Sequence, residues 1–210
     1  RLTRRQRQMC IRDSSEDGSK VGYRQEQRTA DDSNTETYIA LKVEVENFRW
    51  GGVPFYIRTG KQLAKKTVEV IVQFKSLAKS LYMNGLNESA PNQLVIRIQP
   101  NEGVYLRFNT KKPGQSNEAI PVSMDFCQNC EVGYNSPEAY ERLLRDAMLG
   151  EKALFTRWDE VEYSWMFVDA IQRAWANEKP DFPNYSAGSL GPKAADELLA
   201  RDGREWWNEE

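Results

Sequence analysis

Apolar and polar positions alternate along the middle of the chain, and this alternation predicts a series of β-strands. Between residues 39 and 46, isoleucine, leucine and valine at odd positions alternate with Lys42, Glu44 and Glu46. A period of two is typical of a strand with one face in the core. The same pattern recurs at residues 55–58, 68–74, 94–99, 104–109 and 122–126. Residues 100–103, Pro-Asn-Glu-Gly, predict a turn that joins two of these strands as a hairpin.

The last third of the chain changes to helical spacing. Ser136-Pro137 is typical of a helix start, and apolar residues at helical intervals follow as far as Met148. Two further helices are predicted, at about residues 159–177 and between Pro192 and Gly203. Strands followed by helices predict an α+β fold, with a large, mainly antiparallel β-sheet and helices packed on one face. Residues 21–210 are expected to form one domain.

Residues 1–20 do not share this pattern. Five arginines lie within the first twelve positions, and a polar run follows without apolar periodicity. A basic arm for nucleic acid is one interpretation. We favour a non-native or disordered segment, foreign to the protein, because the family resemblance described below begins near Val21.

Composition narrows the function classes. The chain has 210 residues, 40% of them hydrophobic, and a net charge of −2, so a sizeable core is expected and nucleic acid is not an expected partner. No apolar run approaches the roughly 20 residues that cross a bilayer, so no membrane partner is expected. Three cysteines fit a reducing compartment and predict a cytoplasmic location. The chain has no histidine, which excludes Ser-His-Asp and Cys-His catalysis within it, and no metal site is expected.

The connection after residues 55–58 carries the main candidate chemistry. Gly60 is expected to supply backbone freedom for a turn, and Lys61 and Lys66 lie at its two ends. Two ammonium groups held between strands suit a small anion such as a phosphate monoester. An ordinary solvated lysine turn is the alternative. The segment is not a P-loop, because no Ser or Thr follows Lys61.

Several blocks of sequence together resemble the C-terminal domain of the glucose-6-phosphate dehydrogenase family. The blocks occur in the family's order from about Val21 to the C-terminus, which makes the set far more specific than any single one. They are residues 35–38 (TETY), 45–55 (VENFRWGGVPF), 58–61 (RTGK), 92–105 (NQLVIRIQPNEGVY), 110–114 (TKKPG), 137–144 (PEAYERLL), 188–192 (GSLGP) and 195–198 (ADEL).

The resemblance implies that the complete protein oxidises D-glucose 6-phosphate with NADP to 6-phospho-D-glucono-1,5-lactone, in the oxidative pentose phosphate pathway. The chain has no GxGxxG motif, no βαβ pattern and no histidine to act as the family's base. It is therefore expected to lack the Rossmann domain that binds NADP, to bind no cofactor itself and to be inactive alone. A stand-alone, non-catalytic module for sugar-phosphate binding or assembly is the alternative.

The resemblance also implies roles for particular residues. Lysines at the positions of Lys61 and Lys66 contact the substrate in the family, whereas Lys65 is expected to point to the opposite strand face. Subunits of the family pair through the sheet of this domain, so a homodimer is expected.

A second polar cluster is predicted on the sheet. Arg97 and Gln99 share the face opposite Leu94 and its apolar neighbours, and Tyr105 and Arg107 are expected near them across the hairpin. A solvated or subunit-facing surface is one interpretation. In some animal members of the family, the positions of Arg97, Tyr105 and Arg107 help to hold a second, non-catalytic NADP. Thr67 stands where that site uses a lysine, and we expect the second site to be absent here.

Overall fold

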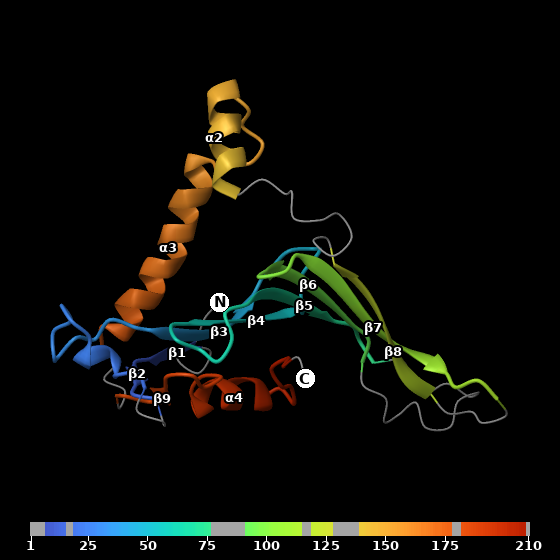
Figure 1. The fold of residues 1–210 in the computed structure, drawn as a ribbon, viewed down its shortest axis with the longest axis horizontal. Coiled ribbons are helices and arrows are strands. Elements are labelled where there is room, and N and C mark those ends of the chain that lie inside the picture. The colour runs from blue at the N-terminus through green and yellow to red at the C-terminus, as the bar shows by residue number, and fades with distance from the viewer. Residues whose placement is uncertain are drawn as a thin grey trace. The chain divides into compact units, whose positions relative to one another are not determined.

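A computed structural model describes residues 7–15, 19–76, 91–114, 119–127, 139–177 and 182–208 (Figure 1). The chain divides into two compact units, one formed by Arg1–Lys65 with Thr156–Glu210 and the other by Lys66–Phe155. The first unit contains strands β1 (Arg7–Cys10), β2 (Arg12–Asp13), β3 (Tyr38–Glu44), β4 (Pro54–Gly60) and β9 (Tyr185–Ser186), the short 3-10 helix η2 (Tyr23–Gln25), and helices α3 (Trp158–Trp175) and α4 (Lys193–Ala200). The second contains β5 (Val68–Gln73), β6 (Gln93–Gln99), β7 (Gly103–Lys111), β8 (Ala119–Cys127) and helix α2 (Ala139–Leu149).

The first unit is built around an antiparallel sheet in the order β1-β3-β4. Side chains on one face of β3 include Tyr38 and Ala40, which pack in a cluster with Leu198 and Leu199 of α4. On the other face, Leu41 packs against Ile171 and Trp175 of α3. Helices therefore cover both faces of this sheet, which differs from the expected arrangement with helices on one face. Burial of each leucine side chain in these clusters contributes about 1.5–3 kcal/mol to the free energy of unfolding.

The expectation that residues 1–20 are disordered is wrong for residues 7–13. Strand β1 pairs with β3 over four residues, and β2 pairs in parallel with β9. Cys10, Ile11 and Arg12 are almost completely buried. This stretch is too short to show apolar periodicity, and its strand is specified by pairing with the edge of β3 that β4 leaves unpaired.

The second unit contains an antiparallel sheet in the order β5-β6-β7-β8, and its β6–β7 hairpin has the predicted turn. Directly paired residues share a face. One face carries two apolar rows across all four strands, Val70–Ile96–Val104–Phe126 and Val72–Leu94–Leu106–Met124. We call these rows, together with Ile98, the apolar face. Seven of its members are exposed in this chain: Val70, Val72, Ile96, Ile98, Val104, Met124 and Phe126.

The α+β class and the mainly antiparallel pairing are confirmed. The strands that the sequence analysis placed in one large sheet are divided between two antiparallel sheets and the short β2–β9 pair. The predicted helices correspond to α2, α3 and α4. Among the described helices, none has the length and apolar character that a bilayer crossing requires.

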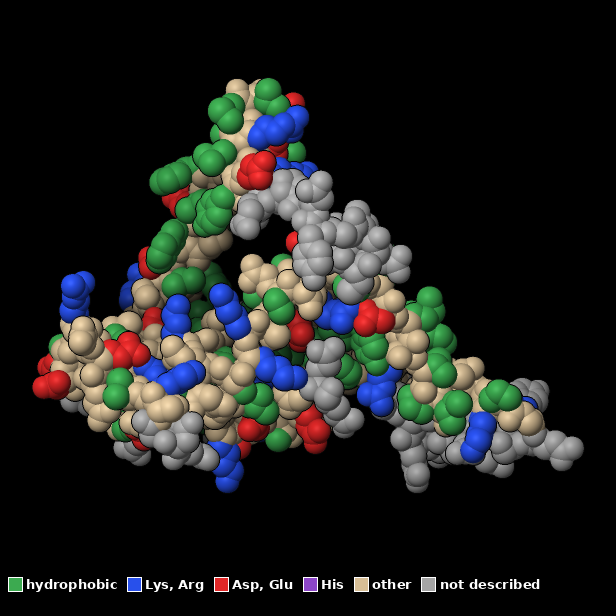
Figure 2. All heavy atoms as spheres, viewed as in Figure 1, with side chains coloured by type: hydrophobic (Ala, Val, Ile, Leu, Met, Phe, Trp, Pro, Cys, Tyr) green, Lys and Arg blue, Asp and Glu red, His purple; other side chains and the backbone are tan. Residues whose placement is uncertain are grey.

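Helix α3 is apolar far beyond the part that packs on the sheet. Its buried residues, Ile171 and Trp175, lie near its C-terminal end. Trp158, Tyr163 and Trp165 are exposed, and Figure 2 shows hydrophobic side chains along the helix. Exposed apolar surface of this extent is typical of an interaction surface.

Candidate functional site

The backbone of Lys61 is fixed on both sides. Its N–H donates to the carbonyl oxygen of Thr37 over 2.8 Å, which extends the β3–β4 pairing by one residue. Its carbonyl oxygen accepts a hydrogen bond from the Tyr185 hydroxyl over 3.1 Å. Lys61 is therefore held between a residue at the start of β3 and a residue from the C-terminal part of the chain.

The Tyr185 hydroxyl lies at the centre of a buried network. It is 3.0 Å from the Thr37 carbonyl oxygen, to which it also donates, and 2.9 Å from Thr37 Oγ1. A phenol has one proton, which the two carbonyl oxygens share, so the Thr37 hydroxyl must be the donor toward Tyr185. Burial raises the pKa of the Tyr185 phenol, which keeps the donating proton in place.

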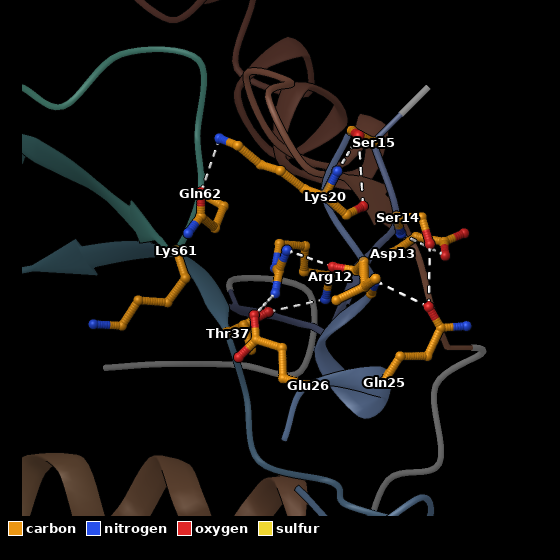
Figure 3. Close-up of polar contacts among 12 residues, drawn as sticks. Arg12, Asp13, Ser14, Ser15, Lys20, Gln25, Glu26, Thr37, Lys61 and Gln62 are labelled. Atoms are coloured by element: carbon orange, nitrogen blue, oxygen red, sulfur yellow. Dashed lines mark hydrogen bonds and ion pairs between the residues drawn. The ribbon is translucent and has the colours of Figure 1, made fainter. Parts of the chain in front are cut away.

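Arg12 closes the network on the other side of Thr37. Its backbone N–H donates to Thr37 Oγ1 over 2.9 Å, and its guanidinium forms an ion pair with Glu26 and donates to the Val21 carbonyl oxygen (Figure 3). The Arg12 side chain is only 3% exposed. A buried guanidinium needs such partners, because an unpaired buried charge is strongly destabilising.

Residues 60–64, which we call the Lys61 turn, are also held by residues 185–189, which we call the clasp. Gly188 N–H donates to the Gln62 carbonyl oxygen over 2.7 Å, and Ala64 N–H donates to that of Ser189 over 3.0 Å. Lys20 Nζ donates to Gln62 Oε1 over 2.9 Å. Gln62 has a positive φ of 55°, a conformation that non-glycine residues rarely adopt without such support.

Gly60 is needed for space, and not for the backbone freedom expected from the sequence. It is paired with Tyr38 in the β3–β4 ladder, and a Cβ atom at this position would lie 2.5 Å from the Tyr38 ring. The left-handed residue of the turn is Gln62. The glycine therefore leaves room for the Tyr38 ring at the end of β4, directly before Lys61.

The Lys61 side chain is exposed and points away from the buried network in Figure 3. Lys66 is the first residue of the second unit and is also exposed. Strand β5 begins only at Val68, so Lys65 and Lys66 both precede it. The strand alternation that was expected to turn Lys65 to the opposite face therefore does not apply to these two residues.

The residues of the proposed second polar cluster lie on the four-stranded sheet of the second unit. Tyr105 is paired with Val95 of β6 and with Asp125 of β8, and Arg107 is paired with Gln93. The Arg97 guanidinium forms an ion pair with Asp125. Gln99 lies two residues further along β6 at its exposed end, next to Val68. The Asp125 carboxylate offsets the positive charge of Arg97 that a bound phosphate would need. This adds to the reasons for expecting no second NADP here.

Two residues of the site could not be identified from the sequence. Thr37 appears only within a block that resembles the family, and Tyr185 lies in an extended stretch between Pro183 and Gly188 without periodicity. Their importance comes from contacts over 148 residues of sequence, which no local pattern reveals.

Comparison with known proteins identifies the family of the chain. Residues 6–207 match the family described as glucose-6-phosphate dehydrogenase, C-terminal domain. The chain is 50% identical over 186 residues to the glucose-6-phosphate 1-dehydrogenase of Bacillus subtilis, covering 89% of this chain and 38% of that protein. It is 47% identical over 192 residues to that of Chlamydia pneumoniae, covering 90% of this chain and 38% of that protein.

Solved structures show the same relationship. A glucose-6-phosphate dehydrogenase in complex with its substrate glucose-6-phosphate superposes with a TM-score of 0.86 and 33% identity, over 99% of this chain and 42% of that one. A glucose-6-phosphate 1-dehydrogenase from Mycobacterium avium superposes with a TM-score of 0.75 and 30% identity, over 100% of this chain and 41% of that one. The chain thus spans about two fifths of the length of these relatives, and it belongs to the glucose-6-phosphate dehydrogenase C-terminal domain family.

Proposed function

We propose that the complete protein containing this chain oxidises D-glucose 6-phosphate with NADP to 6-phospho-D-glucono-1,5-lactone, in the oxidative pentose phosphate pathway. In this proposal the chain supplies substrate-binding residues and a dimerisation surface, and does not catalyse the reaction alone. The observation that carries the proposal is Lys61, a surface lysine whose backbone is fixed on both sides within a region that matches the family.

Lys61 is suited to binding and not to proton transfer. A sugar phosphate offers a dianionic phosphate and several hydroxyl oxygens, and an ammonium group binds such oxygens through charge-assisted hydrogen bonds. A rigid backbone lowers the entropy lost when the side chain is ordered on the ligand. Lys66 is proposed as the second substrate contact, on the strength of the family resemblance.

The NADP site is proposed to lie outside this chain. Dinucleotides bind at the carboxyl edge of a parallel, doubly wound sheet, at a glycine-rich turn. Among the described residues, strands pair antiparallel except for the two-residue β2–β9 contact, and the sequence has no GxGxxG motif. The residues present therefore do not fit a dinucleotide cradle, and hydride transfer needs groups supplied by the rest of the complete protein.

The exposed surface of α3 supports a larger complete protein. Trp158, Tyr163 and Trp165 are exposed in this chain, and burial of such aromatic side chains is strongly favourable. The relatives above extend well beyond the region matched here.

The apolar face of the four-stranded sheet is proposed as the surface that pairs two subunits. A two-fold axis brings the same patch of each subunit together, so a single self-complementary face is sufficient. Its seven exposed apolar residues come from all four strands and form one continuous area. A patch of this composition on a sheet is a common basis for homodimers.

The site is tested by steady-state kinetics of Lys61→Ala in the complete protein, with glucose 6-phosphate varied at saturating NADP. A charge-assisted contact is worth roughly 1.5–3 kcal/mol. The KM for glucose 6-phosphate should therefore rise by about one to two decades. The same contact exists in the ground state and the transition state, so kcat should fall less than KM rises.

Lys193→Ala is the matched control. It removes an exposed lysine at the start of α4, in the same unit, and should leave KM unchanged. An unchanged KM in Lys61→Ala would show that the Lys61 turn is an ordinary solvated turn. A complete protein that binds glucose 6-phosphate without oxidising it would favour the non-catalytic binding module.

A further inference from the structure

The hydroxyl of Tyr185 links the clasp to the backbone of Lys61, the proposed substrate lysine. Tyr185 is separated from Lys61 by 124 residues and contacts its carbonyl oxygen. Neighbouring residues of the clasp bond the same turn at Gln62 and Ala64.

We propose that Tyr185 is a positioning residue for substrate binding, which acts by fixing the direction in which Lys61 leaves the β4 strand. The inference rests on the proposed function, because it takes Lys61 to be a substrate contact. Only 5% of the surface of Tyr185 is exposed, so its side chain is not available for direct contact with a ligand. Its effect on the substrate must therefore pass through the backbone of Lys61.

The positioning depends on the hydroxyl and not on the ring. The ring packs against Tyr38 with a centroid separation of 5.4 Å, and phenylalanine would preserve that contact. Loss of the hydroxyl would leave the Lys61 carbonyl oxygen without this donor and the Thr37 hydroxyl without its acceptor. The Lys61 N–H bond to Thr37 would remain, so the residue would be tied on one side only.

A purely structural role gives a different expectation. A buried tyrosine hydroxyl that only stabilises the fold would change the unfolding midpoint without changing the KM of the folded enzyme. Tyr56 offers a matched control in the same unit, because its hydroxyl donates to Asp202 and has no described contact with the Lys61 turn. Tyr56→Phe also removes one hydroxyl from a ring packed in the same core cluster.

The experiment is a double-mutant cycle in the complete protein, with glucose 6-phosphate and NADP as substrates. Tyr185→Phe should raise the KM for glucose 6-phosphate by about threefold to tenfold, with a change in kcat of less than about twofold. In the Lys61→Ala background, the same substitution should change KM by less than about 1.5-fold, because the side chain it positions is gone. Tyr56→Phe should leave KM unchanged in both backgrounds.

Hydrogen exchange of the same variants gives a readout independent of activity. Tyr185→Phe should speed exchange in the peptide that covers the Lys61 turn by about threefold or more, whereas Tyr56→Phe should not. Unchanged exchange in the Tyr185→Phe variant would overturn the proposal, even if KM moved.

The outcomes separate the two proposals. A raised KM in Lys61→Ala with an unchanged KM in Tyr185→Phe refutes the positioning role alone. If the KM increases of Lys61→Ala and Tyr185→Phe multiply in the double variant, Tyr185 acts independently of Lys61, and the positioning role is also refuted. An unchanged KM in Lys61→Ala refutes both the proposed substrate site and the positioning role.

Discussion

The two units differ in how they use a sheet. In the first, helices cover both faces of the β1-β3-β4 sheet, and the residues around Thr37 are locked by buried hydrogen bonds. In the second, the β5-β6-β7-β8 sheet keeps a continuous apolar face exposed. The first arrangement suits a residue that must be held in one position, and the second suits association with another surface.

The difference bears on Lys61, the proposed substrate-binding lysine. Lys61 follows β4, which pairs with the packed strand β3, and its backbone is bonded to Thr37 and Tyr185, so the core determines its direction. A lysine on an exposed sheet surface would be ordered mainly by its ligand and would lose more entropy on binding. Three predictions test this contrast, from the largest expected effect to the smallest.

Reactivity of Cys10 tests whether the first unit is packed as described. Burial raises the pKa of the Cys10 thiol to about 12, compared with an ordinary value of 9.0. At pH 8 this lowers the thiolate fraction by about a thousandfold. Alkylation by iodoacetamide, followed by peptide mapping, should label Cys10 only after denaturation. Rapid labelling in the folded protein would show that β1 is not part of the sheet, and would contradict the description of the first unit as packed.

Substitution of the apolar face tests whether the exposed sheet surface of the second unit pairs two subunits. Ile98→Asp places a carboxylate among exposed apolar residues and should weaken dimer association by at least about tenfold. Gln99→Asp adds the same charge one residue away, on the opposite face of β6, and should have little effect. Sedimentation of the complete protein across a range of concentrations measures both. Equal association of the two variants would exclude this face as the dimer surface.

The pH dependence of stability tests a smaller feature of the first unit. Hydrogen bonds from Lys42 and Tyr56 hold the pKa of the Asp202 carboxyl below its usual value. A carboxyl with a lowered folded pKa stabilises the protein above its unfolded pKa of about 3.9, and this contribution is lost as the pH falls. Asp202→Asn should flatten the decline in stability below about pH 5. The difference should be about 1 kcal/mol or less, because the Asp202 side chain is 31% exposed.

Chemical denaturation at several pH values measures this difference. Lys193→Ala should leave the pH profile as in the unsubstituted protein, because it removes a charge from the same unit without touching Asp202. Identical profiles for Asp202→Asn and the unsubstituted protein would show that the bonds to Lys42 and Tyr56 contribute nothing in solution.

The elements of the fold were largely predictable, and their grouping was not. Alternation in the segments that became β3 to β8, and helical spacing in those that became α2 and α3, reflect local contacts with one neighbouring layer. Alternation carries no information on which strands are neighbours, so the division into separate sheets was missed. Residues 7–13 were missed because a short edge strand is specified by its partner, β3, and not by its own pattern.

The candidate site shows the same limit. Lys61 and Lys66 could be proposed from the sequence because charge and family resemblance mark them there, and their role stays a prediction. Tyr185 and Thr37 act through backbone carbonyl oxygens that are distant in sequence, and any tyrosine or threonine is equally compatible with the local pattern. Gly60 was identified as important for the wrong reason, since only the structure shows the Tyr38 ring above it.

The most direct test of the central claim is calorimetric binding of glucose 6-phosphate to the complete protein, without turnover, in the unsubstituted and Lys61→Ala forms. The claim is that a lysine held by the packed unit binds the substrate. It predicts a Kd that rises by about ten- to a hundredfold in Lys61→Ala and stays constant in Lys193→Ala. Equal affinity in all three proteins would contradict the claim and would leave Lys61 as a solvated lysine at the end of a strand.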